Sequence, residues 1–246
     1  MTDLASWVRT SHTDEGITHD VYRKGRGPGV VIIHELPGLT REVFAFAEEV
    51  VAAGFTVALP HLFGAVAGVD SRVVSAQAFR QVCVSGEFTK IALGVTAPLT
   101  SWLQSLARAV HAEAAGPGVG ALGMCFTGGF ALAMMLDESV VAPVLAQPAV
   151  PFPIDRARRA DVNLSEGDLA RVADRVRAGC PVLALAYPGD PAVGTRFETL
   201  RTALGENFIE VPLTGKGHAT LTRDRSQVAV DAVLSFFAQR LQPQPD

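Results

Sequence analysis

One stretch of the chain, Val119–Ala131, constrains the fold more than any other; it reads VGALGMCFTGGFA. An apolar run in it ends at a cysteine, and two glycines and helix-forming residues follow directly. This order is typical of a buried strand, a very tight turn and a helix, with the side chain at the turn pushed out beyond the sheet edge. We therefore predict that Cys125 stands at the apex of such a turn, above a helix N-terminus.

That position suits a nucleophile. The positive end of a helix lowers the pKa of a thiol, and the backbone N–H of Phe126 would face the group that Cys125 attacks, as half of an oxyanion hole. The alternative is a structural cysteine buried in a core strand, the usual environment of a free cysteine. These residues alone leave both interpretations open.

The composition narrows the class of protein. The chain has 246 residues, of which 48% are hydrophobic and 19% charged, as is typical of a compact globular protein. A net charge of −4 provides no basic surface for nucleic acid or for an anionic membrane. The three cysteines, Cys83, Cys125 and Cys180, are widely spaced and include no C-x-x-C pair, so we expect reduced thiols and a cytoplasmic protein.

No targeting segment is expected. The N-terminus lacks the basic residues and apolar run of a signal peptide. The uncharged stretch 114–136 is long enough to cross a bilayer, but it contains six glycines and Pro117. A strand, a turn and a helix explain it better than a membrane helix does.

Strands and helices alternate along the chain, starting with the β-branched run Val30–Ile33, which is typical of a strand covered on both faces. Further strands are predicted at 17–23, 55–59, 119–124, 140–146, 181–186 and 208–211, and helices at 41–53, 91–115, 128–136, 165–177, 195–204 and 225–241. We predict one α/β domain over 1–246, ordered over about 17–241, with a doubly wound, mostly parallel sheet and helices on both faces. The irregular stretch 61–87 does not supply the strand–helix pair that a TIM barrel would need.

Four polar residues follow predicted strands: Glu35, Cys125, Asp190 and His218. Ligands of open α/β sheets bind beyond the carboxyl ends of the strands. A nucleophile, an acid and a histidine in this chain order are typical of α/β-hydrolases. Such a set performs nucleophilic acyl transfer, in which the imidazole takes and returns the proton of the thiol and the acid fixes the tautomer.

Each of these residues also has a plainer interpretation. Asp190 lies in Pro-Gly-Asp-Pro, where an aspartate often only forms the turn, and Glu35 could be a solvated loop carboxylate. Their places directly after buried strands favour the catalytic role. A zinc site is not expected, because His34-Glu35 does not continue as H-E-x-x-H and Gly38 occupies the place of the second histidine.

Taken together, these motifs resemble the dienelactone hydrolase family. The likeness rests on VVIIHELPGL at 30–39, GMCFTGG at 123–129, GDPAV at 189–193 and Gly217-His218, and it extends from the first strand to the last helix. It implies an α/β-hydrolase fold and a Cys–Asp–His triad that opens small lactones and esters without a cofactor. It implies that Cys125 is the nucleophile, Asp190 the acid that orients the histidine, and His218 the base. It also implies that Glu35 is the carboxylate that contacts the thiol. The oxyanion amides it implies are those of Leu36 and Phe126.

The chain departs from the family pattern in three places. Thr127 stands where the family usually has glycine, and we expect it to crowd the turn. The segment 148–179 is longer than in small members and would add a wall to the pocket. Of the arginines that bind a substrate carboxylate in the family, Arg80 and Arg223 lie near the expected places, but Thr222 occupies the second position. The resemblance therefore leaves the acyl substrate open.

We therefore expect a hydrolase of small esters or lactones that works through an acyl-enzyme on Cys125, with no cofactor, metal, nucleic acid or membrane partner. The sequence gives no oligomeric state. Two alternatives remain open. One is a degenerate member that binds small molecules without catalysis; the other is a redox sensor in which Cys83 or Cys180 resolves an oxidised Cys125.

Overall fold

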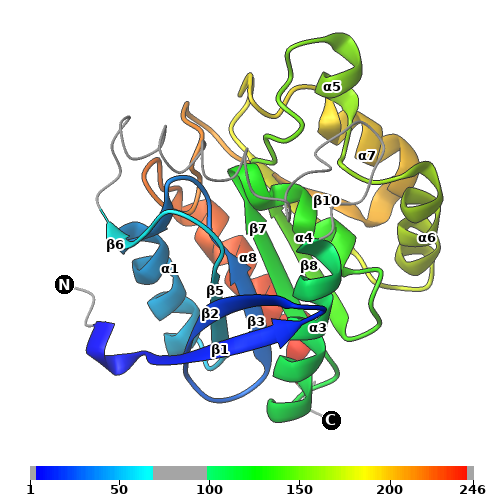
Figure 1. Cartoon of the computed structure of the whole chain (residues 1–246). Helices are drawn as coiled ribbons and strands as arrows, with labels where there is room; N and C mark the ends of the chain where they lie inside the picture. The colour runs from blue at the N-terminus through cyan, green and yellow to red at the C-terminus, as the bar shows by residue number, and fades with distance from the viewer. Residues whose placement is uncertain (1–3, 69–98, 243–246) are drawn as a thin grey trace.

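The structure, a computed structural model, describes residues 4–68 and 99–242. Its centre is an eight-stranded sheet in the order β1-β2-β5-β3-β7-β8-β9-β10 (Figure 1). The strands are β1 (Val8–Asp14), β2 (Ile17–Lys24), β3 (Gly29–Ile33), β5 (Thr56–His61), β7 (Val119–Met124), β8 (Val140–Ala146), β9 (Val182–Ala186) and β10 (Phe208–Pro212). From β5 to β10 every neighbouring pair is parallel, whereas β1 and β2 are antiparallel additions at one edge. The predicted α/β fold with a mostly parallel sheet is confirmed.

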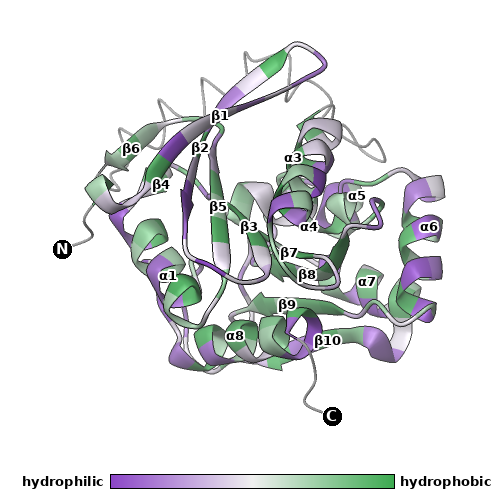
Figure 2. Cartoon of the chain, turned by 90° about the horizontal axis from the view of Figure 1, so that it is seen from below, coloured by the Kyte–Doolittle hydropathy of each residue, from purple (hydrophilic) through white to green (hydrophobic). Residues whose placement is uncertain are grey.

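Helices cover both faces of this sheet. One face packs against α1 (Arg41–Ala52) and α8 (Gln227–Leu241), and the other against α3 (Leu99–Glu113), α4 (Gly128–Met134), α6 (Glu166–Arg177) and α7 (Arg196–Leu204). The remaining elements are short: α5 (Arg156–Ala160), η1 (Leu4–Ser6), η3 (Cys125–Thr127), η4 (Gly205–Asn207), and the parallel pair β4 (Gly38–Thr40) and β6 (Ala65–Gly68). The strands in the middle of the sheet are hydrophobic along their length (Figure 2).

The central strands are buried on both faces, as their unbroken apolar runs require. Every residue of β3 and β7 is buried. Close packing explains one glycine in β7: a Cβ at Gly120 would lie 2.7 Å from the ring of Phe237 on α8. Parallel pairing brings the carboxyl ends of β3, β7, β8, β9 and β10 to one shared edge of the sheet. The loops that leave this edge carry the candidate site residues.

The N-terminal edge differs from the prediction. The predicted ordered core begins at about residue 17, but β1 pairs with β2 along its whole length, from Val8↔Arg23 to Asp14↔Ile17. Glu15 and Gly16 make the turn with positive φ angles of 47° and 81°. The strand was missed because VRTSHTD has almost no apolar residues, and its position is set by backbone pairing rather than by burial.

The predicted helices and strands lie close to their expected bounds, whereas the short elements β4, β6 and α5 are not among those predicted, and β6 lies in the stretch 61–87 that was expected to be irregular. Ser165 accepts the backbone N–H of Asp168 as the N-cap of α6, the helix predicted at 165–177. The predicted helix 91–115 is present as α3, and its residues 91–98 lie outside the described part of the chain. Within residues 4–68 and 99–242, no helix combines the length and the hydrophobicity that crossing a membrane requires.

Candidate active site

Cys125 occupies a sharp turn between β7 and α4. Its φ angle is +51°, in the left-handed region that non-glycine residues rarely adopt. The turn depends on small neighbours, because a Cβ at Gly123 would collide with the backbone oxygen of Thr127, and one at Gly128 would lie 2.6 Å from Pro148. The thiol is half-buried at the carboxyl edge of the sheet. The structure therefore has the strand, tight turn and helix that the sequence predicts here.

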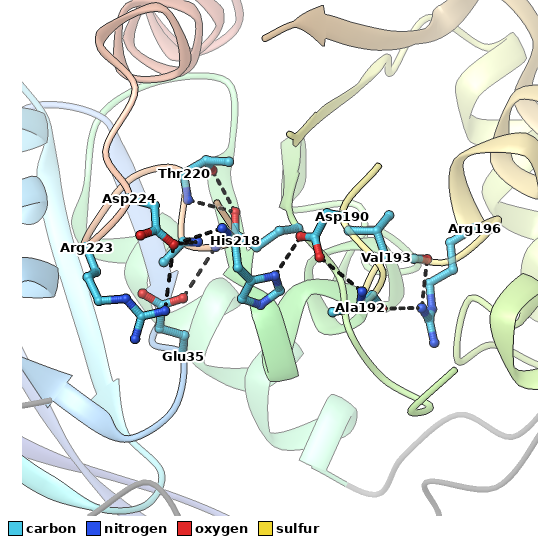
Figure 3. A network of polar contacts seen from close by, with 11 residues as sticks. Glu35, Asp190, Ala192, Val193, Arg196, His218, Thr220, Arg223 and Asp224 are labelled. Atoms are coloured by element: carbon cyan, nitrogen blue, oxygen red, sulfur yellow. Dashed lines mark hydrogen bonds and ion pairs between the residues drawn. The ribbon is translucent and has the colours of Figure 1, made fainter. Parts of the chain in front are cut away.

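His218 and Asp190 meet at the same edge. His218 lies in the loop between β10 and α8, and its Nδ1 is 2.6 Å from Oδ2 of Asp190, in the loop between β9 and α7 (Figure 3). The other carboxylate oxygen of Asp190 accepts the N–H of Ala192 at 3.0 Å. Asp190 is thus both the turn former and the partner of the imidazole. Asp224 holds the histidine loop by accepting the N–H groups of His218 and Ala219 at 2.8 and 3.1 Å.

The imidazole also interacts with the thiol. Burial disfavours the charged ring, but hydrogen bonds to Asp190 and Cys125 outweigh it and raise the pKa of His218 to about 10. The negative charge of both partners acts in the same direction. The side chains of Cys125, His218 and Asp190 therefore form one connected group, in which a proton on the ring is strongly favoured.

Glu35 lies beside this group and is almost fully buried. The hydroxyl of Thr222 donates to Oε1 of Glu35, and Nε2 of Gln147 lies 3.3 Å from Oε2. Burial raises the pKa of Glu35, whereas these two hydrogen bonds and the charges of His218 and Arg223 lower it. The solvated-loop interpretation of Glu35 is therefore wrong, because the carboxyl group is enclosed and hydrogen-bonded.

His34, next to Glu35, has a structural role. Its Nε2 accepts the N–H of Leu62 at 3.1 Å, so Nδ1 carries the proton and donates to the carbonyl of Glu35 at 3.0 Å. Complete burial lowers the pKa of this ring to about 3. The neutral imidazole thus fixes the backbone of the Glu35 loop against the loop that follows β5.

His34 makes acid stability testable. Its pKa is about 3 in the folded protein and 6.5 ordinarily, so below pH 6.5 the unfolded chain binds a proton that the folded chain does not, and stability falls as the pH falls. We expect this residue to remove about 2 kcal/mol of unfolding free energy between pH 6 and pH 4. Urea unfolding of His34→Gln should show a much flatter pH dependence over this range than wild type.

His12→Gln is the control, because His12 is only partly buried and its pKa is lowered mainly by that partial burial. It should flatten the curve far less. Parallel curves for wild type and His34→Gln would show that His34 is not the group that titrates.

Thr127 does not crowd the turn. Its side chain is completely buried and its hydroxyl accepts the N–H of Met124 at 3.1 Å. The same oxygen lies 3.0 Å from the carbonyl of Ile33 and 3.1 Å from that of His34. The hydroxyl thus joins the nucleophile turn to the loop after β3, which carries Glu35 and Leu36. The expected steric conflict is absent because the extra atoms fill a polar gap between two strand ends.

Among the polar residues of the site that the sequence does not predict are two that join separate loops, Arg196 and Gln147. Arg196, buried at the start of α7, donates to the carbonyls of Ala192 and Val193 at 2.9 and 2.8 Å and also to that of Pro151. It thereby ties the Asp190 loop to the loop after β8; Figure 3 shows its contacts with Ala192 and Val193. Burial lowers its pKa to about 10. Gln147 is the other, and its place directly after the apolar strand β8 was a usable signal.

The remaining predicted residues are placed as follows. Leu36 and Phe126 each follow a candidate residue, Glu35 and Cys125. Arg223 is 58% exposed and lies 3.7 Å from the carboxylate of Asp224. Arg80, like Cys83, is outside the described residues. Over the described ranges, no three His, Cys, Asp or Glu side chains form a group that could hold a metal ion.

Comparison with known proteins agrees with this geometry. Residues 18–239 match the dienelactone hydrolase family. The chain belongs to this family. It is therefore an ester or lactone hydrolase by family membership, and the predicted family resemblance is confirmed over nearly its whole length. No protein in the curated set matches the sequence significantly.

Solved structures of dienelactone hydrolase-like proteins share the fold. The dienelactone hydrolase of Anabaena variabilis has a TM-score of 0.67 at 16% identity, with 96% of this chain and 98% of that chain covered. A promiscuous, dienelactone hydrolase-like phosphotriesterase from metagenomic libraries gives the same values. A cold-adapted esterase from an Arctic intertidal metagenomic library has a TM-score of 0.64 at 18% identity, with 95% and 93% covered. At these identities the likeness shows the fold alone.

Proposed function

We propose that this member of the dienelactone hydrolase family cleaves small esters or lactones through a covalent acyl-enzyme on Cys125. The observation that carries the proposal is the connected group of Cys125, His218 and Asp190 at the sheet edge. The left-handed φ of +51° at Cys125 supports it, because backbone strain of this kind is concentrated at active sites, where the surrounding structure enforces it.

The raised pKa of His218 makes its ring a strong proton acceptor in the reaction that we propose. His218 takes the proton of Cys125, and the resulting thiolate attacks the carbonyl carbon of the substrate. When the tetrahedral intermediate collapses, the C–O bond to the leaving group breaks and the imidazolium gives its proton to that oxygen. A water molecule, deprotonated by His218, then attacks the thioester and releases the acid and the thiol. Asp190 orients the ring and stabilises its positive charge throughout.

In this proposal the oxyanion is bound by the N–H groups of Leu36 and Phe126. Phe126 follows the nucleophile, as is usual for this kind of turn, and Leu36 follows Glu35 in the loop that Thr127 ties to the turn. Preorganised donors of this kind supply a large share of the rate in acyl transfer. Glu35 is the carboxyl group that the family resemblance assigns to contact with the thiol, and the charge of the imidazole acts on it.

Two neighbouring residues of the His218 loop, Thr222 and Arg223, bear on how a substrate is bound. The hydroxyl of Thr222 is directed inward to Glu35, so Thr222 does not act as a substrate-binding arginine would. Arg223, exposed at the same loop, is the residue we assign to a negatively charged group of a substrate. Arg80 stays a prediction.

The test is a burst experiment with 4-nitrophenyl acetate under rapid mixing. We expect wild type to release about one equivalent of nitrophenolate per active site before the steady state, because acylation of a thiol is faster than hydrolysis of the thioester. The Cys125→Ala variant should give no burst. A wild-type protein without ester cleavage would favour the alternative of a small-molecule binding protein.

The redox-sensor alternative is weakened by the position of Cys180. Its thiol lies 3.5 Å from the carbonyl of Val141, at the start of β8, whereas Cys125 follows the end of the neighbouring strand β7. Six residues of strand span roughly 20 Å, so Cys180 cannot reach an oxidised Cys125 in the folded protein. Burial also raises the pKa of the Cys180 thiol.

A further inference from the structure

A chain of buried polar side chains joins three loops beside the proposed triad. It runs from Thr220 through Gln147 and Glu35 to Thr222. Gln147 and Thr220 are completely buried, and Glu35 and Thr222 are 6% and 7% exposed. Glu35 follows β3, Gln147 follows β8, and both threonines lie in the His218 loop. Buried polar groups of this kind are costly unless each is hydrogen-bonded.

The amide of Gln147 can be oriented from its neighbours. Its Oε1 lies 2.6 Å from Oγ1 of Thr220 and 3.4 Å from the backbone N of Thr220, and that backbone N–H is a donor only. The acceptor oxygen therefore faces Thr220, and Nε2 faces Glu35 as a donor. The backbone supports this placement: Gln147 has a φ of +37° and donates its own N–H to Leu185 at 2.6 Å.

This orientation makes the two oxygens of Glu35 unequal as places for a proton. Oε2 accepts from Nε2 of Gln147, which leaves Oε1 as the better place for a proton on the carboxyl group. That oxygen is paired with the hydroxyl of Thr222. A hydroxyl donates to a carboxylate in a charge-assisted bond that is stronger than the bond it accepts from a neutral carboxylic acid, so Thr222 favours the ionised form of Glu35.

The charged groups that face Glu35 lie in the loop between β10 and α8. His218 and Arg223 both attract its negative charge, while burial opposes it. The adjacent ring of His34 is neutral and adds no charge. Within the described part of the chain, the side chains hydrogen-bonded to this carboxyl are those of Thr222 and Gln147, and both are uncharged.

We propose that Thr222 and Gln147 are positioning residues: their hydrogen bonds hold the Glu35 carboxyl in one orientation against the His218 loop, and the hydroxyl of Thr222 favours the ionised carboxylate by donating to Oε1. The proposal rests on the proposed function only for the part that Glu35 takes in the reaction. The state of the carboxyl group itself can be measured without any substrate.

The test follows the carboxyl carbon of Glu35 by NMR in protein labelled with [δ-¹³C]glutamate, with the signal assigned by its loss in Glu35→Gln. Thr222→Val removes the donor to the carboxylate at nearly constant volume. We expect its titration midpoint to move to higher pH, with about a tenfold change in the protonation equilibrium. Thr222→Ser keeps a hydroxyl and should restore the wild-type midpoint.

Thr202→Val, at an exposed threonine whose hydroxyl donates within α7, is the matched control and should leave the Glu35 signal unchanged. Gln147→Leu provides a second variant if Thr222→Val does not fold, and it should also move the midpoint upward. An unmoved midpoint in the folded Val or Leu variant would overturn the proposal, as would an equal shift in Thr222→Ser. Since no substrate is used, a protein that titrates as expected but cleaves no ester rejects only the proposed function.

Discussion

Replacement of Cys125 by serine is expected to lower kcat/KM for small aryl esters by about 10³-fold or more. The side chain keeps its place at the turn, but its proton is far harder to remove than that of a thiol. The proton acceptor, His218, is matched to a sulfur nucleophile because its pKa is raised by Asp190 and by Cys125 itself. Steady-state kinetics on 4-nitrophenyl acetate would measure the loss.

Cys180→Ser is the matched control for this substitution. Cys180 is a buried cysteine at the opposite end of the parallel strands. Cys180→Ser therefore makes the same sulfur-to-oxygen replacement as Cys125→Ser, but at a residue that does not contact the site. We expect its kcat/KM to stay within about threefold of wild type, as for a change outside the active site. A wild-type rate in Cys125→Ser would mean that the thiol is not the attacking group.

Asp190→Asn has the second largest expected effect, a loss of about 10³-fold in kcat/KM. The amide can still accept the N–H of Ala192 and keep the turn, which separates the role in the turn from the role in the triad. It cannot offer a charged acceptor to Nδ1 of His218, so the ring loses both its fixed tautomer and a cause of its raised pKa. The ring is then a weaker acceptor for the proton of Cys125.

This effect of Asp190 on the nucleophile can be measured without an ester. The rate of iodoacetamide labelling at Cys125, followed by mass spectrometry of its peptide, reports the thiolate fraction. We expect the onset of fast labelling to move to higher pH in Asp190→Asn. Asp231→Asn, on the exposed side of α8, should label like wild type. Identical profiles for all three proteins would show that Asp190 does not act on the nucleophile through His218.

Much of this arrangement could be predicted from local sequence. Cys125, Asp190 and His218 each follow an apolar strand, and parallel strands bring their carboxyl ends to one edge whatever their distance in the chain. The turn at Cys125 is predictable because only glycine fits at two crowded positions near it, Gly123 and Gly128. Burial and turn geometry act over a few residues, which is why these features show in the sequence.

The rest depends on contacts that no short pattern records. Arg196 resembles a surface residue of an amphipathic helix, yet it is buried because carbonyl groups from two other loops surround it. Thr127 suggested crowding, but its hydroxyl fits between the ends of β3 and β7. Gln147 follows a strand like the triad residues, but an amide does not titrate, so its residue type does not indicate a catalytic group.

The most direct test of the nucleophile is to trap the acylated protein. Wild type is mixed with 4-nitrophenyl acetate, quenched in acid within the burst, digested and examined by mass spectrometry. The expected result is one acetyl group per chain on the peptide that contains Cys125, absent from the Cys125→Ala protein. Acetyl found on another side chain, or steady ester cleavage with Cys125 never modified, would contradict the account.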